Sequence, residues 1–205
     1  MRGLIGKKIG MTRIFNSVGN AVPVTILEVG PCHVTQVKTI DSDGYDAVQL
    51  GFVETKDKSI TKPLSGHFKK NNVKPAKILA EFKKVPKFDY KPGQTFNVGL
   101  FIEGDFVTVS GVSKGRGFAG TIKKYSFSTQ RKTHGQGDTH RHVGSIGAAS
   151  DPSRVFPGKK MPGRYGNKTV SGKDLEVVLV NENKNQLLVK GSVPGSANGI
   201  VYITR

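Results

Sequence analysis

Twelve Lys and Arg side chains lie between residues 111 and 168, together with eleven glycines and only two carboxylates, Asp138 and Asp151. Cations at this density bind polyanions, because each one neutralises an anionic group and releases its condensed counterion. The window supplies +10 of the chain's formal net charge of +17 and has too few apolar side chains to close a core of its own. We therefore expect an arm that becomes ordered on a polyanion.

The first motif in this window is Gly115-Arg-Gly117-Phe-Ala-Gly120, which matches the G-x-G-x-x-G pattern of dinucleotide-binding turns. That interpretation requires a βαβ unit and an acidic residue about 20 positions further on. Asp138 lies near that distance, but in a stretch that does not resemble a strand. We favour close backbone approach to phosphates, with Thr121–Tyr125 opening a helix and a flexible glycine hinge as the plain alternative. The contacts predicted at this point are Lys114, Arg116, Gly117, Lys123 and Lys124.

Three histidines, His134, His140 and His142, follow within nine residues. Together with Asp138 they are a conceivable metal set, but the neighbouring cations would repel a divalent ion and no cysteine lies nearby. We predict no metal, and favour hydrogen bonding to or stacking on nucleotides, with inactive exposed histidines as the remaining alternative. The contacts predicted for this stretch are Arg131, Lys132, His134, His140, Arg141, His142 and Ser145.

Catalysis by Ser145, His142 and Asp138 is a weaker hypothesis. The segment has no oxyanion-hole context and no nucleophile-elbow sequence. We therefore predict that the protein is not an enzyme and has no cofactor. The chain's single cysteine, Cys32, excludes an intrachain disulfide, and we expect it to be a small buried thiol.

Aromatic and basic residues alternate toward the end of the window, as nucleic-acid contacts require: charge for phosphates and flat faces for bases. The candidates for stacking are Phe118, Tyr125, Phe127, Phe156 and Tyr165, with packing at the base of the arm as the alternative for Phe118 and Phe127. The further predicted contacts are Arg154, Lys159, Lys160, Arg164, Tyr165 and Lys168, extended outside the window by Lys7, Lys8 and Arg13. Lys69, Lys70, Lys83 and Lys84 are interpreted as a solvated face, with an extension of the nucleic-acid contact as the alternative.

The rest of the chain, residues 1–110 and 169–205, is typical of short strands with tight turns. Strands are predicted at Thr12–Phe15, Ala21–Val29, His33–Ile40, Tyr45–Val53, Phe96–Ile102, Asp105–Ser110, Leu175–Val180, Gln186–Lys190 and Ile200–Ile203. A turn is predicted at Asn16–Asn20, and hairpin turns at Asp41–Gly44 and Asn181–Asn185. One or two short helices are predicted near residues 60–86, one of them starting at Pro75. The predicted fold is mainly β, a closed or nearly closed antiparallel barrel from which residues 111–168 leave as a long loop.

The net charge of +17 makes nucleic acid the leading partner class and an anionic membrane surface the second. The N-terminus has no apolar run of signal-peptide length, and no segment approaches about 20 consecutive apolar residues. We expect a cytoplasmic protein that does not enter a membrane.

Taken in order, the motifs resemble one family. They are Gly6-Lys-Lys-Ile-Gly-Met-Thr12, Ser113-Lys-Gly-Arg-Gly-Phe-Ala-Gly120, Thr133-His-Gly135, His140-Arg141, Gly144-Ser-Ile-Gly147, Val155-Phe156, Gly158-Lys-Lys-Met161, Leu187-Leu-Val-Lys-Gly191 and Val193-Pro-Gly195. This combination resembles the large-subunit ribosomal protein L three family in its bacterial form, over nearly the whole chain.

The resemblance implies a barrel like that of translation factors, seated on 23S-type rRNA, with a loop that threads toward the peptidyl-transferase region. Its tip would be Gly144–Arg154. It also implies a role in early subunit assembly, neighbouring large-subunit proteins as partners and no homo-oligomer. Ser150 stands where many bacterial members have a methylated glutamine, which puts that modification in doubt. Thr108 and Lys124 also depart from the family pattern, without opposing rRNA binding.

Two other functions fit parts of the sequence. The hypothesis of a nucleotide-dependent oxidoreductase is supported by residues 115–120 alone. A general DNA-compacting protein fits the charge, and would be distinguished by its failure to prefer folded rRNA over duplex DNA.

Overall fold

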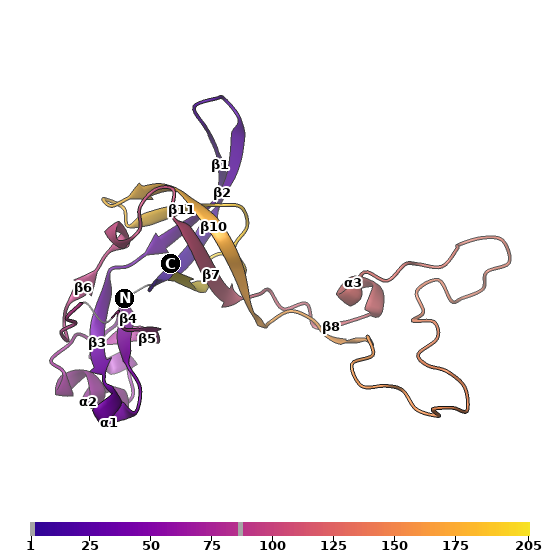
Figure 1. Ribbon diagram of the computed structural model, residues 1–205, viewed down its shortest axis with the longest axis horizontal. Coiled ribbons are helices and arrows are strands. Elements are labelled where there is room, and N and C mark those ends of the chain that lie inside the picture. The colour runs from indigo at the N-terminus through magenta and orange to yellow at the C-terminus, as the bar shows by residue number, and fades with distance from the viewer. Residues whose placement is uncertain (1–2, 86–87) are drawn as a thin grey trace. The chain divides into compact units, whose positions relative to one another are not determined.

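The computed structural model describes residues 3–85 and 88–205, and divides the chain into two compact units. Residues 1–113 and 169–205 form one unit, which we call the body, and residues 114–168 form the other, which we call the arm. Both are drawn in Figure 1.

Six strands of the body close into an antiparallel barrel, in the order β1-β12-β7-β10-β11-β2 (Figure 1). Their bounds are Gly3–Phe15 (β1), Ala21–Val29 (β2), Phe106–Val112 (β7), Thr169–Asn181 (β10), Gln186–Lys190 (β11) and Ile200–Thr204 (β12). Apolar side chains at alternate positions of β7 and β12 are buried, as expected for strands with one face on a core. The barrel confirms the predicted fold class.

Strands β1 and β2 continue outward as a two-stranded ribbon that projects from the barrel in Figure 1. Pairing of β12 with β1 ends at Lys7, and pairing of β11 with β2 ends at Val24. The ribbon is closed by the predicted turn at Asn16–Asn20, where the Asn16 side-chain oxygen accepts hydrogen bonds from the backbone N–H of Val18 (3.2 Å) and Asn20 (2.8 Å).

A second, four-stranded antiparallel sheet has the order β5-β4-β3-β6. Its strands are Cys32–Lys38 (β3), Ala47–Glu54 (β4), Ala76–Lys83 (β5) and Thr95–Phe96 (β6). The predicted hairpin between β3 and β4 is confirmed. Its connection is one helical turn, α1 (Ile40–Asp43), which ends at Gly44 with a left-handed φ of 81°.

The helical region near residue 60 was predicted only in part. The short 3₁₀ helix η1 (Asp57–Ser59) precedes helix α2 (Lys62–Lys70), which confirms one helix. The helix predicted to start at Pro75 is wrong, because β5 pairs with β4 along its full length and this pairing overrides the loose helical spacing. The end of the predicted range, Pro86, lies outside the described residues.

The strand predicted at Phe96–Ile102 is also wrong. Strand β6 ends at Phe96, and Val98–Leu100 forms a 3₁₀ helix, η2. Val98 and Phe101 are both buried, and residues three apart share one side of a 3₁₀ turn. A short turn with two apolar residues on one side therefore replaces the strand.

Both sheets of the body share one hydrophobic core. It brings together buried side chains of the barrel, such as Leu4 and Ile203, and of the second sheet, such as Val34 and Leu50. Cys32 lies in this core, where its thiol donates to the Ile5 carbonyl (3.5 Å) and burial raises its pKa to about 11. This confirms the expected buried thiol.

Polar contacts hold α2 on the second sheet. His67 Nε2 lies 2.8 Å from Gln49 Oε1, and the Asn71 side chain donates to the Thr35 carbonyl (2.8 Å). On the same sheet, Lys38 forms an ion pair with Glu81 (2.8 Å). The body therefore combines an apolar core with a hydrogen-bonded helix.

The arm contains little regular structure. Its elements are β8 (Phe118–Ala119), α3 (Thr121–Tyr125) and β9 (Gly163–Arg164). The helix predicted at Thr121–Tyr125 is confirmed. No helix in the described part of the chain is long and apolar enough to cross a membrane.

Candidate nucleic-acid interface

The arm leaves and re-enters the body at one rung of the barrel. Strand β7 ends at Val112, β10 begins at Thr169, and these two residues are directly paired. The arm is therefore a long insertion between two neighbouring antiparallel strands.

The base of the arm is a short antiparallel ribbon. Phe118 pairs with Arg164 and Ala119 with Gly163. The ribbon is extended by backbone hydrogen bonds from Arg116 N–H to the Tyr165 carbonyl and from Tyr165 N–H to the Gly117 carbonyl, both 2.9 Å. The glycine motif at 115–120 thus contains strand β8, which pairs with β9 near the other end of the arm.

Gly166 allows the two chains to approach closely. Its φ is 70°, and a Cβ built on it would lie 2.1 Å from the Lys114 carbonyl oxygen. The side chain of any other residue would clash with backbone atoms there, and its backbone would also be held at an unfavourable φ. The sequence reasoning missed this role, although the turn-rich stretch around Tyr165 was a signal for it.

Cations of the arm lie over its aromatic rings. The Arg116 guanidinium lies 5.5 Å from the centre of the Tyr165 ring, and Lys124 and Lys160 lie 5.0 Å and 5.8 Å from that of Tyr125. Such contacts orient charge beside flat apolar faces and are worth about 0.5–1 kcal/mol at exposed sites. The base of the arm therefore presents ordered cation–aromatic pairs.

The stacking candidates differ in exposure. Phe118 is 81% exposed and Phe156 is 56% exposed, with the Arg154 guanidinium 5.3 Å from the centre of the Phe156 ring. Phe127 is half-buried beside Tyr125, with ring centres 6.2 Å apart. The packing alternative therefore fits Phe127, while Phe118 offers a free face.

The histidine stretch is closed by hydrogen bonds of its own. The Gln130 N–H donates to the His140 carbonyl (3.1 Å), and His140 Nδ1 lies 2.8 Å from the Arg131 carbonyl. His134 and His142 are exposed. Among the described residues no three His, Cys, Asp or Glu side chains gather closely enough to hold a metal ion. His140 thus shapes the loop, and the other two imidazoles face solvent.

The tip of the arm carries small residues around a pocket of about 380 Å³, lined on its two sides by residues 145–149 and 153–155. The Ser145 hydroxyl donates to the Gly147 carbonyl (2.9 Å). This bond supports the turn at the tip and leaves the predicted serine in a structural contact.

Most of the predicted contact residues in the arm are exposed. The exposed ones are Lys114, Arg116, Gly117, Lys123, Arg131, Lys132, His134, Arg141, His142, Ser145, Arg154, Lys159, Lys160, Arg164 and Lys168, whereas Lys124, His140 and Tyr165 are half-buried. With two carboxylates against twelve cations in residues 114–168, the arm keeps a net charge of +10 whatever pairs form within it.

The three predicted body contacts have different surroundings. Lys8 donates to the backbone carbonyls of Val193 (2.6 Å) and Gly195 (3.4 Å) and so ties β1 to the segment before β12. Lys7 is half-buried, and Arg13 is exposed on the projecting ribbon. These residues belong to the body, and the arm residues form a separate unit.

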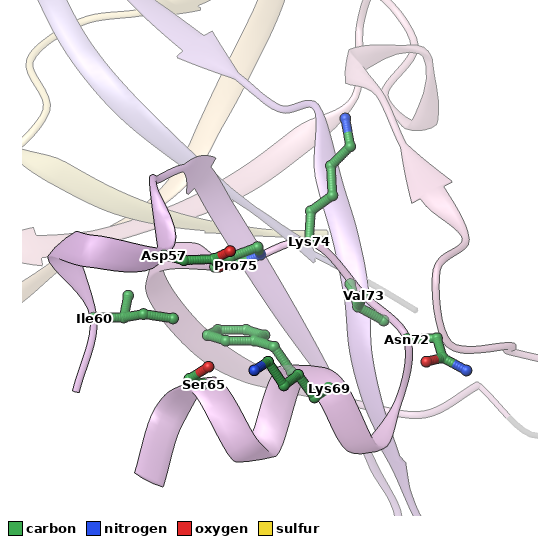
Figure 2. Close-up of a pocket in the computed structure, with 9 residues that line it drawn as sticks. Asp57, Ile60, Ser65, Lys69, Asn72, Val73, Lys74 and Pro75 are labelled. Atoms are coloured by element: carbon green, nitrogen blue, oxygen red, sulfur yellow. The ribbon is translucent and has the colours of Figure 1, made fainter. Parts of the chain in front are cut away.

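A pocket of about 340 Å³ lies on the body beside α2 (Figure 2). Lys69 and Lys74 line it together with Asp57, and Ile60, Val73 and Pro75 give it apolar walls. One carboxylate among these cations makes the pocket a poorer polyanion site than the arm.

The dinucleotide-binding alternative does not fit this geometry. The motif at 115–120 contains β8, which pairs antiparallel with β9, and α3 spans only Thr121–Tyr125. A dinucleotide site requires parallel strands joined by a crossover helix. The strand pairs in the described part of the chain are antiparallel.

Comparison with known proteins gives one consistent family. The family described as ribosomal protein L3 matches residues 85–188. Among curated relatives, the large ribosomal subunit protein uL3 of Thermotoga petrophila is 50% identical over 99% of this chain and 96% of its own. The uL3 proteins of Petrotoga mobilis (47% identical, 99% and 94% covered) and Chlorobium phaeobacteroides (50% identical, 99% and 98% covered) are similar to it as well.

The family match over half of the chain and the relatives of about 50% identity along nearly all of it agree with the motifs and the barrel. The chain belongs to the ribosomal protein L3 family.

Proposed function

We propose that this chain is a structural, non-catalytic constituent of the large ribosomal subunit that binds 23S-type rRNA directly through its arm. Its bacterial relatives carry the name large ribosomal subunit protein uL3, which supports a place in the ribosome in the cytoplasm. The observation that carries the proposal is the arm's surplus of cations, twelve against two carboxylates, beside exposed aromatic rings.

The proposed division of labour follows the arm's geometry. Lys114, Arg116, Lys123 and Lys124 surround the paired base and would hold phosphates close to the backbone. Phe118 and Phe156 would stack on bases or sugars that their neighbouring cations draw near. The tip, with no cation between His142 and Arg154, would pass between RNA segments toward the peptidyl-transferase region.

The proposal includes early subunit assembly and contact with neighbouring large-subunit proteins. An arm with a net charge of +10 repels itself in the free protein, and phosphates relieve that repulsion. The conformational entropy lost on ordering the arm would then be offset by counterion release from the RNA. Binding while the rRNA is still folding gives the arm access that a finished particle would block.

Matched charge pairs test the RNA-binding surface. Lys159→Gln/Lys160→Gln removes two exposed cations of the arm, and Lys69→Gln/Lys70→Gln removes two exposed cations of α2. With large-subunit rRNA fragments at fixed salt, we expect the arm pair to lose about tenfold in affinity and the α2 pair to lose less than threefold. Equal losses for both pairs would contradict a contact centred on the arm.

Competition with duplex DNA tests the class of nucleic acid. A ribosomal role requires preference for folded rRNA over duplex DNA at matched salt. Equal competition by the two would instead favour the DNA-compacting alternative.

A further inference from the structure

The projecting β1–β2 ribbon has a surface unlike that of the arm. Residues 9–23 contain a single charged side chain, Arg13, in a chain with 32 Lys and Arg. Within the described pairing, Gly10–Phe15 pair only with β2, and Ala21–Pro23 only with β1. A two-stranded ribbon without a third strand or a packed face is only marginally stable in water.

One face of this ribbon presents Met11, Arg13 and Phe15. These residues alternate along β1, so they point to the same side, about 7 Å apart. Residues directly opposite share a face, which places Pro23 beside Arg13 and Ala21 beside Phe15. Met11 is 52% and Phe15 is 68% exposed. The result is an open apolar face with one cation at its centre.

The composition of this face argues against RNA as its occupant. Contact with RNA is built from several cations, because each phosphate carries a charge that must be met. Met, Arg and aromatic side chains are the types enriched at the cores of protein–protein interfaces. A single Arg between two apolar side chains complements one carboxylate in an apolar surface, and does not complement a phosphate backbone.

We propose that the ribbon face formed by Met11, Arg13 and Phe15 docks on a neighbouring protein, in an apolar groove that carries one carboxylate facing Arg13. This assigns Arg13 to a protein partner, where the sequence predicted an rRNA contact. The inference depends on the chain's place in a multi-protein particle and not on the arm's contact with rRNA.

Site-directed photocrosslinking tests the assignment in the intact particle. p-Benzoyl-phenylalanine would replace Phe15, or Phe156 of the arm, in the full-length chain expressed in bacteria. Large subunits would then be purified, irradiated and divided by nuclease treatment. We expect the Phe15 position to give a nuclease-resistant adduct with a protein whose crosslinked surface includes Asp or Glu. The Phe156 position should give an RNA adduct if the proposed function is correct.

The outcomes separate the two proposals. A protein adduct at Phe15 without an RNA adduct at Phe156 would support the docking face and count against the arm's function. An RNA adduct at Phe15, or none there while Phe156 reacts, would overturn the docking face. A crosslinked protein surface with no carboxylate would overturn it as well.

Substitutions test the energetics. Phe15→Ser should lower incorporation into large subunits about tenfold in competition with the unchanged chain, while Val18→Ser, at the 79%-exposed turn, should have little effect. The melting temperature of the free protein should be the same for both variants, because both side chains are exposed. Arg13→Glu should fail in the same competition and be rescued by changing the partner's crosslinked carboxylate to Lys. Equal incorporation of all variants, or no rescue, would contradict the proposal.

Discussion

Val112 and Thr169 face each other across the β7–β10 ladder, although the whole arm lies between them in sequence. The barrel thereby holds both ends of the arm together. Closing this long loop lowers the chain's conformational entropy, and strand pairing in the body offsets that loss. The arm can therefore order or disorder without opening the barrel. This relationship separates the body's stability from the arm's binding.

Deletion of residues 130–165 should leave the body folded. The arm supplies no strand to the barrel, and loop-closure entropy changes slowly with loop length, so we expect a melting temperature within a few degrees of the full-length value. Far-ultraviolet circular dichroism measures this directly. The deleted protein should be defective in subunit assembly. Loss of the strand signal in the deletion variant would show that the arm is part of the core.

Gly166→Ala should disturb the paired base of the arm. The added Cβ would lie 2.1 Å from the Lys114 carbonyl oxygen at a φ of 70°. We expect faster hydrogen exchange at the backbone N–H groups of Arg116 and Tyr165, which bond across the base.

Gly158→Ala is the matched control for this change. Gly158 has a φ of 79° but no atom within 4 Å of an added Cβ, so it shares the backbone strain without the clash. The exchange rates at Arg116 and Tyr165 should not change in this control. The same acceleration in both variants would mean that close approach at Gly166 is not what orders the base.

Glu81→Gln should make the stability of the folded protein fall less steeply as the pH is lowered. The hydrogen bond from Lys38, followed by that from Tyr45, holds the pKa of Glu81 below its ordinary value. A lowered folded-state pKa gives stability that is present above the unfolded pKa of about 4.3 and is lost as pH falls through the folded pKa.

Urea unfolding between pH 7 and pH 3 measures this effect. The urea midpoint of the unchanged protein should fall more steeply over this range than that of Glu81→Gln. Asp138→Asn, an exposed carboxylate of the arm, is the control and should keep the original slope. Parallel curves for Glu81→Gln and the unchanged protein would contradict the assigned ion pair. At the alkaline end, the same contact raises the pKa of Lys38, so its stabilising effect should be fully present below the unfolded pKa of about 10.4 and be lost as pH rises through the raised value.

Cys32 should resist alkylation in the folded protein. Burial raises its pKa to about 11, and only the thiolate reacts. At pH 8 iodoacetamide should react on the order of 100-fold more slowly with the folded chain than with the chain in urea. Mass spectrometry of timed samples gives both rates. Equal rates would place the thiol outside the core.

The sequence predicted the parts of the structure that local patterns control. The turns at Asn16–Asn20, Asp41–Gly44 and Asn181–Asn185 are set by their own residues, and each joins the expected strand pair. The closed barrel was predicted from the short strands, the tight turns and the small amount of helix. The strand at Ala76–Lys83 was missed, because its partner β4 lies far away in the chain and decides its conformation.

The arm also has some features that local sequence determines and others that depend on distant residues. Its charge is a property of composition, so the sequence predicted it directly. The pairing of Ala119 with Gly163 and the close approach at Gly166 depend on residues more than forty positions apart, and no local pattern encodes them. On the ribbon face at Met11 and Phe15, the sequence singled out only the cation Arg13. A strand pattern does not show whether an apolar side chain is exposed, so Met11 and Phe15 were not predicted.

The salt dependence of rRNA binding tests the central claim, that the arm's cations bind rRNA phosphates. A variant with six exposed arm cations changed to Gln (Lys123, Lys132, Arg141, Lys159, Lys160 and Arg164) would be compared with the unchanged chain on the same large-subunit rRNA fragment. If all six meet phosphates, the slope of log K against log salt should become shallower by about 4 to 5, from 0.7–0.9 for each contact. An unchanged slope, or an affinity of the unchanged chain that does not depend on salt, would contradict the claim.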